Sequence, residues 1–236
     1  MADSETQRAT VTGSLPDDNL TREQLLLSMY ALSHTLQNKL SNIFAAWNNY
    51  RLAPSNPAET LEEIMIQVQA MKTQVNNIYR FSKPQEDNLV KDICSIADYC
   101  STAFSHYRQQ AELQHRTLTT SFFPKGSIYT DTSRLDLILD NVFSNAIRYA
   151  PINTNVHMEV AFFAGVLMMT VTNQFDHFPE DRLQDIFQPA VQLDHHHTGC
   201  GLGLYICQKN IQLLGGTISA TCTPQTFSIA IRLPAV

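Results

Sequence analysis

The feature that most constrains this chain is the spacing of apolar residues in its first third. From Leu25 to Tyr50 these residues recur every three or four positions, which places them along one stripe of a helix. The segment APSNPAET at 53–60 interrupts the spacing with two prolines, and the spacing resumes from Leu61 to Ile78. The pattern predicts two helices joined by a short turn, a helical hairpin. Because two helices enclose little interior, we expect a second copy to complete a four-helix bundle in a homodimer.

After about residue 84 the pattern changes to a mixture of helices and strands. Helical spacing covers 88–113, 133–149 and a segment from Gly203 to the Gly215-Gly216 pair, a typical helix terminus. Alternating apolar and polar residues predict two strand hairpins, at 156–163 with 166–173 and at 217–223 with 227–233. Helices and strands are clustered rather than regularly alternating, so the fold class is α+β.

The expected organisation therefore has three parts. Residues 1–20 are polar and carry no periodicity, which predicts a flexible tail. Residues 21–83 form the helical hairpin, and residues 84–236 form an α+β domain.

Composition excludes several classes of function. Sixteen Lys and Arg against 22 Asp and Glu give a net charge of -6, so binding to a nucleic-acid backbone is not expected as the main activity. The five cysteines include no C-x-x-C pair and signal neither a disulfide framework nor a zinc cage. The longest apolar stretch is far shorter than the ~18 residues that span a bilayer. We therefore expect a cytoplasmic protein with reduced thiols and no membrane segment.

The first candidate for chemistry is His34, on the first helix of the hairpin. At about 100° per residue it lies about 200° from both Leu32 and Leu36, so it faces solvent. Asn38, one turn further on, shares that exposed face. Taken alone, this pattern is also that of an ordinary surface histidine.

Two further patterns favour nucleotide chemistry. Asn141 and Asn145 place two amides at i and i+4 on one helix, and such oxygen ligands suit Mg²⁺ held together with substrate phosphates. Gly199, Gly201 and Gly203 alternate at the start of an apolar helix, where the backbone can approach a phosphate and the helix N-terminus offers unpaired N–H groups. Either pattern alone is weak, because helix-surface amides and glycine runs are common.

In this order, the motifs resemble the catalytic half of a sensor histidine kinase. ALSHTLQNKLSNI is similar to the phosphoacceptor helix of that family, and YTDTSRLDLILDNVFSNAIRYAP to the N box of its GHKL-type ATP-binding domain. DIFQPA resembles the F box, and TGCGLGLYICQKNIQLLGGTI the second glycine box with the helix that follows. The resemblance implies a dimeric four-helix bundle followed by a GHKL (Bergerat-type) α/β sandwich.

The resemblance also implies a two-step reaction with ATP and Mg²⁺. His34 would take the γ-phosphoryl group on Nε2, and an aspartate of a response-regulator receiver domain would then take it from His34. By the family pattern, Asn145 would be the Mg²⁺ ligand and Asn141 would support the phosphates. Arg148 and Tyr149 would line the nucleotide, and Gly199, Gly201 and Gly203 would form the lid over the phosphates. Asn38 would orient the water that attacks when the regulator is dephosphorylated.

Three departures from the family pattern support an alternative. Asn173 stands where the family has an adenine-binding Asp, with Phe175 and His177 at two glycine positions. Thr35 follows His34 where many members have an acid, and Ala190 replaces the second aromatic residue of the F box. In the alternative, the protein is a pseudokinase or histidine phosphotransferase that relays phosphoryl groups between receiver domains without ATP.

A third class is an ATPase of the topoisomerase, chaperone or mismatch-repair type, which shares the Asn and Gly architecture. That class would not explain the hairpin with His34, and its members commonly have an acid where Asn141 stands. The run Asp194-His195-His196-His197 suggests a metal site, but three adjacent histidines fit one ion poorly, and we interpret it as a solvated loop.

Overall fold

The structure is a computed structural model that describes residues 9–13, 22–52, 56–82, 88–122, 125–175, 179–189, 191 and 201–235. It divides into two compact units. The sheet unit comprises residues 1–16, 87–187 and 204–236, and the hairpin unit comprises residues 17–86 and 188–203. The chain therefore leaves the sheet unit, forms the hairpin and returns.

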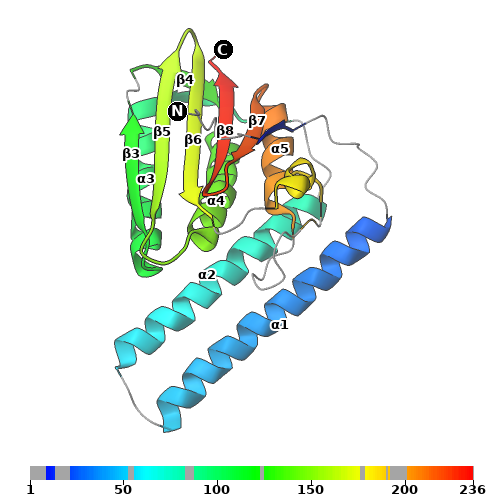
Figure 1. Ribbon diagram of the computed structural model, residues 1–236, viewed down its shortest axis with the longest axis vertical. Helices are drawn as coiled ribbons and strands as arrows, with labels where there is room; N and C mark the ends of the chain where they lie inside the picture. The colour runs from blue at the N-terminus through cyan, green and yellow to red at the C-terminus, as the bar shows by residue number, and fades with distance from the viewer. Residues whose placement is uncertain are drawn as a thin grey trace, which may run out of the picture. The chain divides into compact units, whose positions relative to one another are not determined.

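The hairpin unit contains the two expected helices, α1 (Arg22–Leu52) and α2 (Pro57–Ser82) (Figure 1). Asn56 caps the second helix, because its Oδ1 accepts from the N–H of Ala58 at 3.1 Å and its side-chain NH₂ donates to Glu59 at 3.1 Å. Pro57 occupies the first helical position, where its missing N–H costs nothing. Pro57 and the Asn56 cap thus start the second helix.

The hairpin has a small interior. Among the described side chains of α1 and α2, only Thr35 and Ala46 are buried. Large apolar side chains remain exposed along both helices, including Phe44 at 65% and Met65 at 60%. The others on these two helices are Leu26, Met29, Tyr30, Leu40, Trp47, Leu52, Leu61, Val68 and Val75.

The sheet unit is a two-layer sandwich. Its main sheet has the order β1-β7-β8-β6-β5-β3, antiparallel except for the β3–β5 pair. The strands are β1 (Ala9–Thr12), β3 (Thr117–Phe122), β5 (Asn155–Phe163), β6 (Val166–Gln174), β7 (Thr217–Cys222) and β8 (Thr226–Pro234). Helices α3 (Ile96–Leu113), α4 (Thr132–Tyr149) and α5 (Gly203–Leu213) cover one face (Figure 1). A short 3-10 helix, η1 (Glu180–Asp185), and a two-stranded sheet of β2 (Asp92–Ser95) and β4 (Ser127–Thr130) complete it.

The core lies between the main sheet and the helices. Every second residue of β6 is buried, as period-two alternation requires of a strand with one covered face. From α4 the fully buried side chains are Leu135, Ile138, Leu139, Phe143 and Ile147, and from the sheet Met158, Leu167, Met169 and Ile231. The predicted α+β class, both strand hairpins and the helices at 133–149 and 203–213 are confirmed.

Two expectations from the sequence are wrong. Residues 9–12, assigned to a flexible tail, form the edge strand β1, since pairing with β7 supplies hydrogen bonds that no local pattern announces. Residues 92–95, assigned to a helix, form β2, and α3 begins only after Ser95, whose hydroxyl accepts from the N–H of Asp98. The rest of the expected tail, 1–8 and 14–20, lies outside the described residues.

No helix among the described residues is both long and apolar enough to cross a lipid bilayer.

Candidate functional site

The candidate site is built around α4, which carries the two asparagines of the predicted N box. Asn141 is buried, and its side-chain NH₂ donates to the carbonyl oxygen of Leu137 at 2.9 Å. Asn145, one turn later, is half-buried, and its side chain makes no hydrogen bond with the described residues. Its amide oxygen is therefore available to a ligand, and an amide oxygen suits a hard cation such as Mg²⁺.

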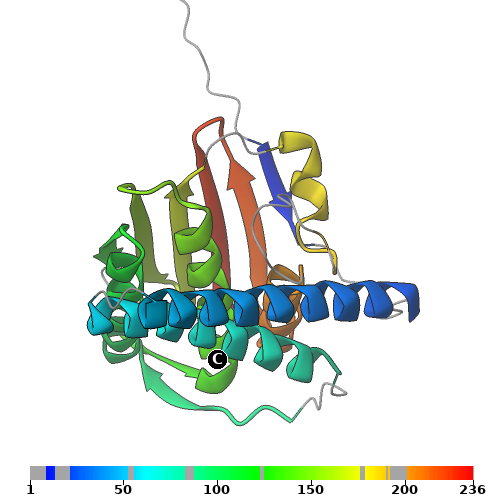
Figure 2. The same ribbon diagram turned by 90° about the horizontal axis from the view of Figure 1, so that it is seen from below.

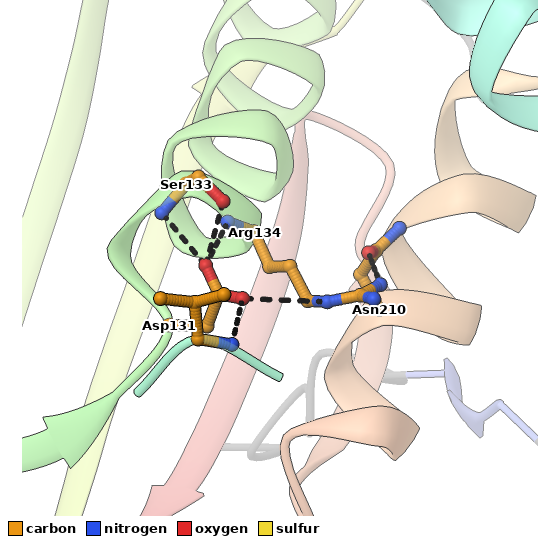
Figure 3. Close-up of polar contacts among 5 residues, drawn as sticks. Asp131, Ser133, Arg134 and Asn210 are labelled. Carbon is orange, nitrogen blue, oxygen red and sulfur yellow. Dashed lines mark hydrogen bonds and ion pairs between the residues drawn. The ribbon is translucent and has the colours of Figure 1, made fainter. Parts of the chain in front are cut away.

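The start of α4 is held by a buried network (Figure 3). Asp131 accepts from the N–H and hydroxyl of Ser133 at 3.1 and 2.6 Å, and from the N–H groups of Arg134 and Val90. Burial alone would raise the pKa of Asp131, but these hydrogen bonds and the Arg134 charge outweigh it, so the pKa lies below its ordinary value. The network stabilises the charged carboxylate as an N-cap.

The same network joins α4 to α5. The guanidinium of Arg134 lies 3.7 Å from Asp131 and donates to Asn210 Oδ1 at 2.9 Å (Figure 3). Asn210 is itself buried and donates to the carbonyl oxygen of Ile206 at 2.8 Å. The helix that follows the glycine box is thus tied to the helix of the N box.

Two tyrosines of α3 hold the outer side of α4. The hydroxyl of Tyr107 donates to Asp140 at 2.6 Å, and that of Tyr99 donates to Asp136 at 2.7 Å. The Tyr107 ring also stacks on Phe143, with centroids 4.2 Å apart. Burial and the nearby carboxylates raise the pKa of both tyrosines, so both stay protonated as donors.

Asn173 lies near the end of β6 on the face that the helices cover. It continues the buried series Leu167, Met169 and Val171, and only 2% of it is exposed. Its side-chain NH₂ donates to the carbonyl oxygen of Gln174 at 2.7 Å. Its Oδ1 has no hydrogen-bond partner among the described residues, so a buried acceptor is available for a donor such as the amino group of adenine.

An aromatic cluster lies directly beyond Asn173. The ring of Phe175 lies 5.7 Å from that of Tyr149 at the end of α4, and 6.5 Å from that of Phe227 on β8. The N–H of Phe175 donates to the carbonyl oxygen of Gln225 at 3.1 Å. A large ring therefore occupies the position where the family pattern has a glycine. Sequence reasoning missed Phe227, which only strand pairing places opposite Asn173.

The glycine box is described in part. Gly201 has φ +66°, a left-handed conformation that favours glycine, and Gly203 is the first residue of α5. Gly199, His177, Ala190 and the run Asp194–His197 lie outside the described residues. Within the residues that are described, no group of three or more His, Cys, Asp or Glu side chains is placed to hold a metal ion.

His34 lies exposed on α1, as its helical position predicts. Its Nδ1 is 3.3 Å from the side-chain nitrogen of Asn38, one turn further along. Thr35 is buried, with 3% exposed. Asn38 is thus the polar group in contact with the imidazole, and the residue after the histidine points away from solvent.

The structure brings some of the predicted residues together within the sheet unit. Tyr149 and Phe175 are in contact, and Asn173 lies two residues before Phe175. Arg148, next to Tyr149 in the sequence, is half-buried, and its side chain makes no hydrogen bond with the described residues. Sequence reasoning missed the Asp131–Arg134–Asn210 network, because Asn210 is 76 residues from Arg134 and no local pattern predicts their contact.

Comparison with known families agrees with this architecture. Residues 130–236 match the family described as histidine kinase-, DNA gyrase B-, and HSP90-like ATPase. The match begins at the end of β4 and includes α4, the Asn173 strand and the glycine box. It does not include α1 and α2.

Two curated relatives match a larger share of the chain than the family model does. The alginate biosynthesis sensor protein KinB of Pseudomonas aeruginosa is 24% identical over 202 residues, which are 81% of this chain and 34% of that protein. The sensor histidine kinase CpxA of Escherichia coli K12 is 29% identical over 214 residues, 87% of this chain and 45% of that protein. The chain thus spans less than half the length of either relative.

Solved structures show the same fold. The histidine kinase ThkA in complex with the response regulator TrrA matches 91% of this chain and 64% of its own, with a TM-score of 0.65 and 19% identity. Full-length ShkA in complex with AMPPNP matches 91% of this chain and 46% of its own, with a TM-score of 0.61 and 18% identity. The chain therefore has the fold of a sensor histidine kinase core, a helical hairpin with an ATPase domain of the histidine kinase, DNA gyrase B and HSP90 type at residues 130–236.

Proposed function

We propose that this protein is a histidine protein kinase of two-component signalling. ATP bound to the sheet unit donates its γ-phosphoryl group to Nε2 of His34, and a receiver-domain aspartate of a response regulator then takes it. The observation that carries the proposal is the exposed His34 on a helical hairpin in the same chain as an ATPase domain of the kinase type. Residues 21–83 would be the dimerisation and phosphotransfer part, and 84–236 the ATP-binding part.

The described residues fit a purine nucleotide. The buried Oδ1 of Asn173 would accept from the adenine amino group, a neutral hydrogen bond weaker than one to an aspartate. Tyr149 and Arg148 would line the nucleotide, Asn141 would support its phosphates, and Gly199, Gly201 and Gly203 would let the backbone close over them. A related fold was solved with AMPPNP, an ATP analogue, in ShkA.

Mg²⁺ fits the same helix. Asn145 would be its protein ligand, because its amide oxygen is unengaged by the described residues. When bound, Mg²⁺ would neutralise charge that develops on the phosphates.

The transfer step uses the lone pair of a neutral imidazole. Nε2 of His34 forms a bond to the γ-phosphorus, the bond from that phosphorus to the bridging oxygen breaks, and ADP leaves with that oxygen. The proton then on the imidazole passes to solvent. Thr35 is buried and has no carboxyl group, so Asn38 is the side chain next to the ring. While Nε2 attacks, the ring proton is on Nδ1, and the Asn38 amide would turn its oxygen to accept from that N–H. Asn38 would also orient the water that dephosphorylates the regulator.

The exposed apolar face of the hairpin supports a homodimer. Leu40, Phe44 and Trp47 on α1, and Leu61, Met65 and Val68 on α2, recur at steps of three and four, as in an unpaired bundle face. A second copy of the hairpin would cover it. The receiver partner is supported by the ThkA–TrrA complex, in which a related fold is bound to a response regulator.

The deciding experiment is incubation of the purified protein with γ-labelled ATP and Mg²⁺. Label is expected on the unmodified chain, to be lost in His34→Gln and kept in His106→Gln, a matched change at an exposed helical histidine. Absence of label from the unmodified chain, or label that survives His34→Gln, would refute the kinase.

A second candidate, an ATP-independent phosphotransferase, is favoured by the contact of Phe175 with Tyr149. In that case the ring of Phe175 fills the space in which kinases of this family bind the adenine base. A phosphorylated receiver would then charge His34 while ATP does not. Phe175→Gly together with Asn173→Asp is expected to tighten ATP binding by about tenfold or more, since it restores room and a charge-assisted hydrogen bond.

A further inference from the structure

The segment 9–13 is an addition to the main sheet that lies outside the 130–236 family match. Its strand β1 pairs with β7 in the register Ala9–Cys222, Thr10–Thr221, Val11–Ala220 and Thr12–Ser219. The N–H of Gly13 extends the ladder by donating to the carbonyl oxygen of Ile218 at 3.0 Å. Figure 2 shows β1 in blue at the outer edge of the sheet.

This segment contacts the elements on both sides of the glycine box. β1 lies against η1, which precedes that box in the chain (Figure 2). Gly13 lies against α5, which follows it, so closely that a Cβ at Gly13 would overlap Nε2 of the buried Gln208. A side chain at residue 13 would therefore displace Gln208 or the segment, which explains a glycine at this position.

Pairing of β1 gives the hairpin a second attachment to the sheet unit. The chain passes from Gly13 through residues 14–21 into α1, and it returns from α2 to β2 at Asp92. An extended chain covers at most about 3.6 Å per residue, so residues 14–21 reach roughly 30 Å. A unit held by one linker can swing widely, whereas one held by two short connections cannot.

The pairing is also weak enough to be reversible. β1 has four residues and lies at the sheet edge, so it has one neighbouring strand instead of two. Thr10 and Thr12 are exposed, which leaves Val11 and Ala9, both half-buried, as its apolar contribution. Short edge elements with few buried contacts belong to the part of a fold that opens most easily.

We propose that residues 9–13 are a strap, which pairs reversibly with the β7 edge and, while paired, restricts how far the sheet unit travels relative to the hairpin. The free edge of β7 is therefore covered by residues 9–13 of the same chain. The restriction follows from pairing and chain length alone. Its consequence for phosphoryl transfer to His34 rests on the proposed function, because transfer requires the ATP site to reach the histidine.

The register supplies a matched pair of variants. In an antiparallel ladder, hydrogen-bonded pairs alternate, and the Gly13–Ile218 bond makes Val11–Ala220 the next such pair. Val11→Pro removes an N–H that faces β7, whereas Thr10→Pro removes one that faces outward. Amide hydrogen exchange at Ala220 is therefore expected to speed up in Val11→Pro and to stay slow in Thr10→Pro; equal exchange in both would overturn the assigned pairing and with it the strap.

The paired state of the strap can be locked with a disulfide. Thr12 and Ser219 form a non-hydrogen-bonded pair, where Cα atoms approach closely enough for a disulfide. Oxidised Thr12→Cys with Ser219→Cys should hold the strap, and reduction of the same sample should free it. Small-angle X-ray scattering should give a broader distribution of intramolecular distances for Val11→Pro than for the oxidised protein, with the reduced protein resembling the unmodified chain; identical distributions in the locked and released proteins would overturn the proposal.

Labelling of His34 from ATP, measured in the same proteins, separates the two proposals. We expect labelling to rise several-fold on release of the strap and to fall on oxidation. A chain that takes no label in any form refutes the kinase and leaves the scattering result standing. Labelling of equal rate in the released and locked proteins refutes the restraint of transfer by the strap.

Discussion

The two units of this protein place their apolar residues in opposite ways. In the sheet unit, side chains such as Phe143, Leu135 and Ile231 are enclosed between the sheet and three helices. In the hairpin unit, residues of similar size such as Phe44 and Trp47 are at least half exposed. The sheet unit therefore buries its apolar side chains within one chain, whereas the hairpin unit leaves an apolar face exposed after the chain has folded. This difference supports the proposed homodimer, in which a second hairpin would cover the exposed face.

The largest loss of stability should come from a cavity in the core of the sheet unit. Phe143→Ala removes a ring that is fully buried and stacked on Tyr107, so the sheet unit should lose about 3–5 kcal/mol of unfolding free energy. Denaturant unfolding followed by near-ultraviolet circular dichroism measures it. Phe163→Ala, at a side chain 76% exposed on the same sheet, is the control and should cost far less. Equal losses would mean that the core is not where the structure places it.

The next effect concerns the buried carboxylate of Asp131. Asp131→Asn removes charge-assisted hydrogen bonds from Ser133, Val90 and Arg134 and should destabilise the sheet unit by about 1–3 kcal/mol at pH 7. Because the pKa of Asp131 is lowered in the folded state, its contribution is present above its ordinary pKa of 3.8 and is lost as pH falls through the folded value.

The measurement is therefore the unfolding free energy of both proteins at neutral and acid pH. The difference between them should shrink as the pH falls below about 4. A difference that persists unchanged in acid would show that charge is not what the network stabilises.

In the hairpin unit, a change on the exposed apolar face should weaken dimerisation instead of unfolding the protein. Phe44→Glu places a charge on the exposed face of α1 and should raise the dimer dissociation constant at least about tenfold, about 1.4 kcal/mol, with helix content kept. Sedimentation over a concentration series measures it. Asn42→Glu adds the same charge at an exposed position about 200° away around the helix and should leave association unchanged. A Phe44→Glu protein that associates like the unmodified chain would show that this face is not the dimer interface.

The smallest effect tests the outer side of α4. Tyr107→Phe removes one hydrogen bond to Asp140 and keeps the ring stacked on Phe143, so the expected loss is about 1 kcal/mol. Thermal unfolding resolves a change of this size in a domain of this length. Tyr99→Phe removes the parallel bond to Asp136 and should cost a similar amount. A loss as large as that of Phe143→Ala would show that the hydroxyl of Tyr107 contributes more than one hydrogen bond.

Much of this architecture could be predicted from the sequence, because the signals are local. Apolar residues at steps of three and four identify α1 and α2, and alternation identifies β5, β6, β7 and β8. The helical position of His34 predicts its exposure, and the structure agrees. The N box and glycine box are contiguous motifs, so the comparison with the ATPase family confirms a resemblance already visible in the residues.

The misses share a physical cause. Residues 9–12 look like a polar tail, because a four-residue strand has too few positions for a pattern and depends on β7, more than two hundred residues away. The helix predicted for 88–113 begins late, since Ser95 caps it and the segment before it pairs with β4. Side-chain hydrogen bonds and strand pairing decide such boundaries, and neither is periodic.

By itself, then, the sequence determined the helices, most strands, the order of motifs and the solvent-facing position of His34, since each depends on neighbours within a few residues. Only the tertiary structure decided that Asn173 is buried with its Oδ1 unengaged by the described residues, that Phe175 lies against Tyr149, and that residues 9–13 close the sheet edge. Those outcomes depend on residues far apart in the chain, whose contacts form only when the sheet and its helices come together.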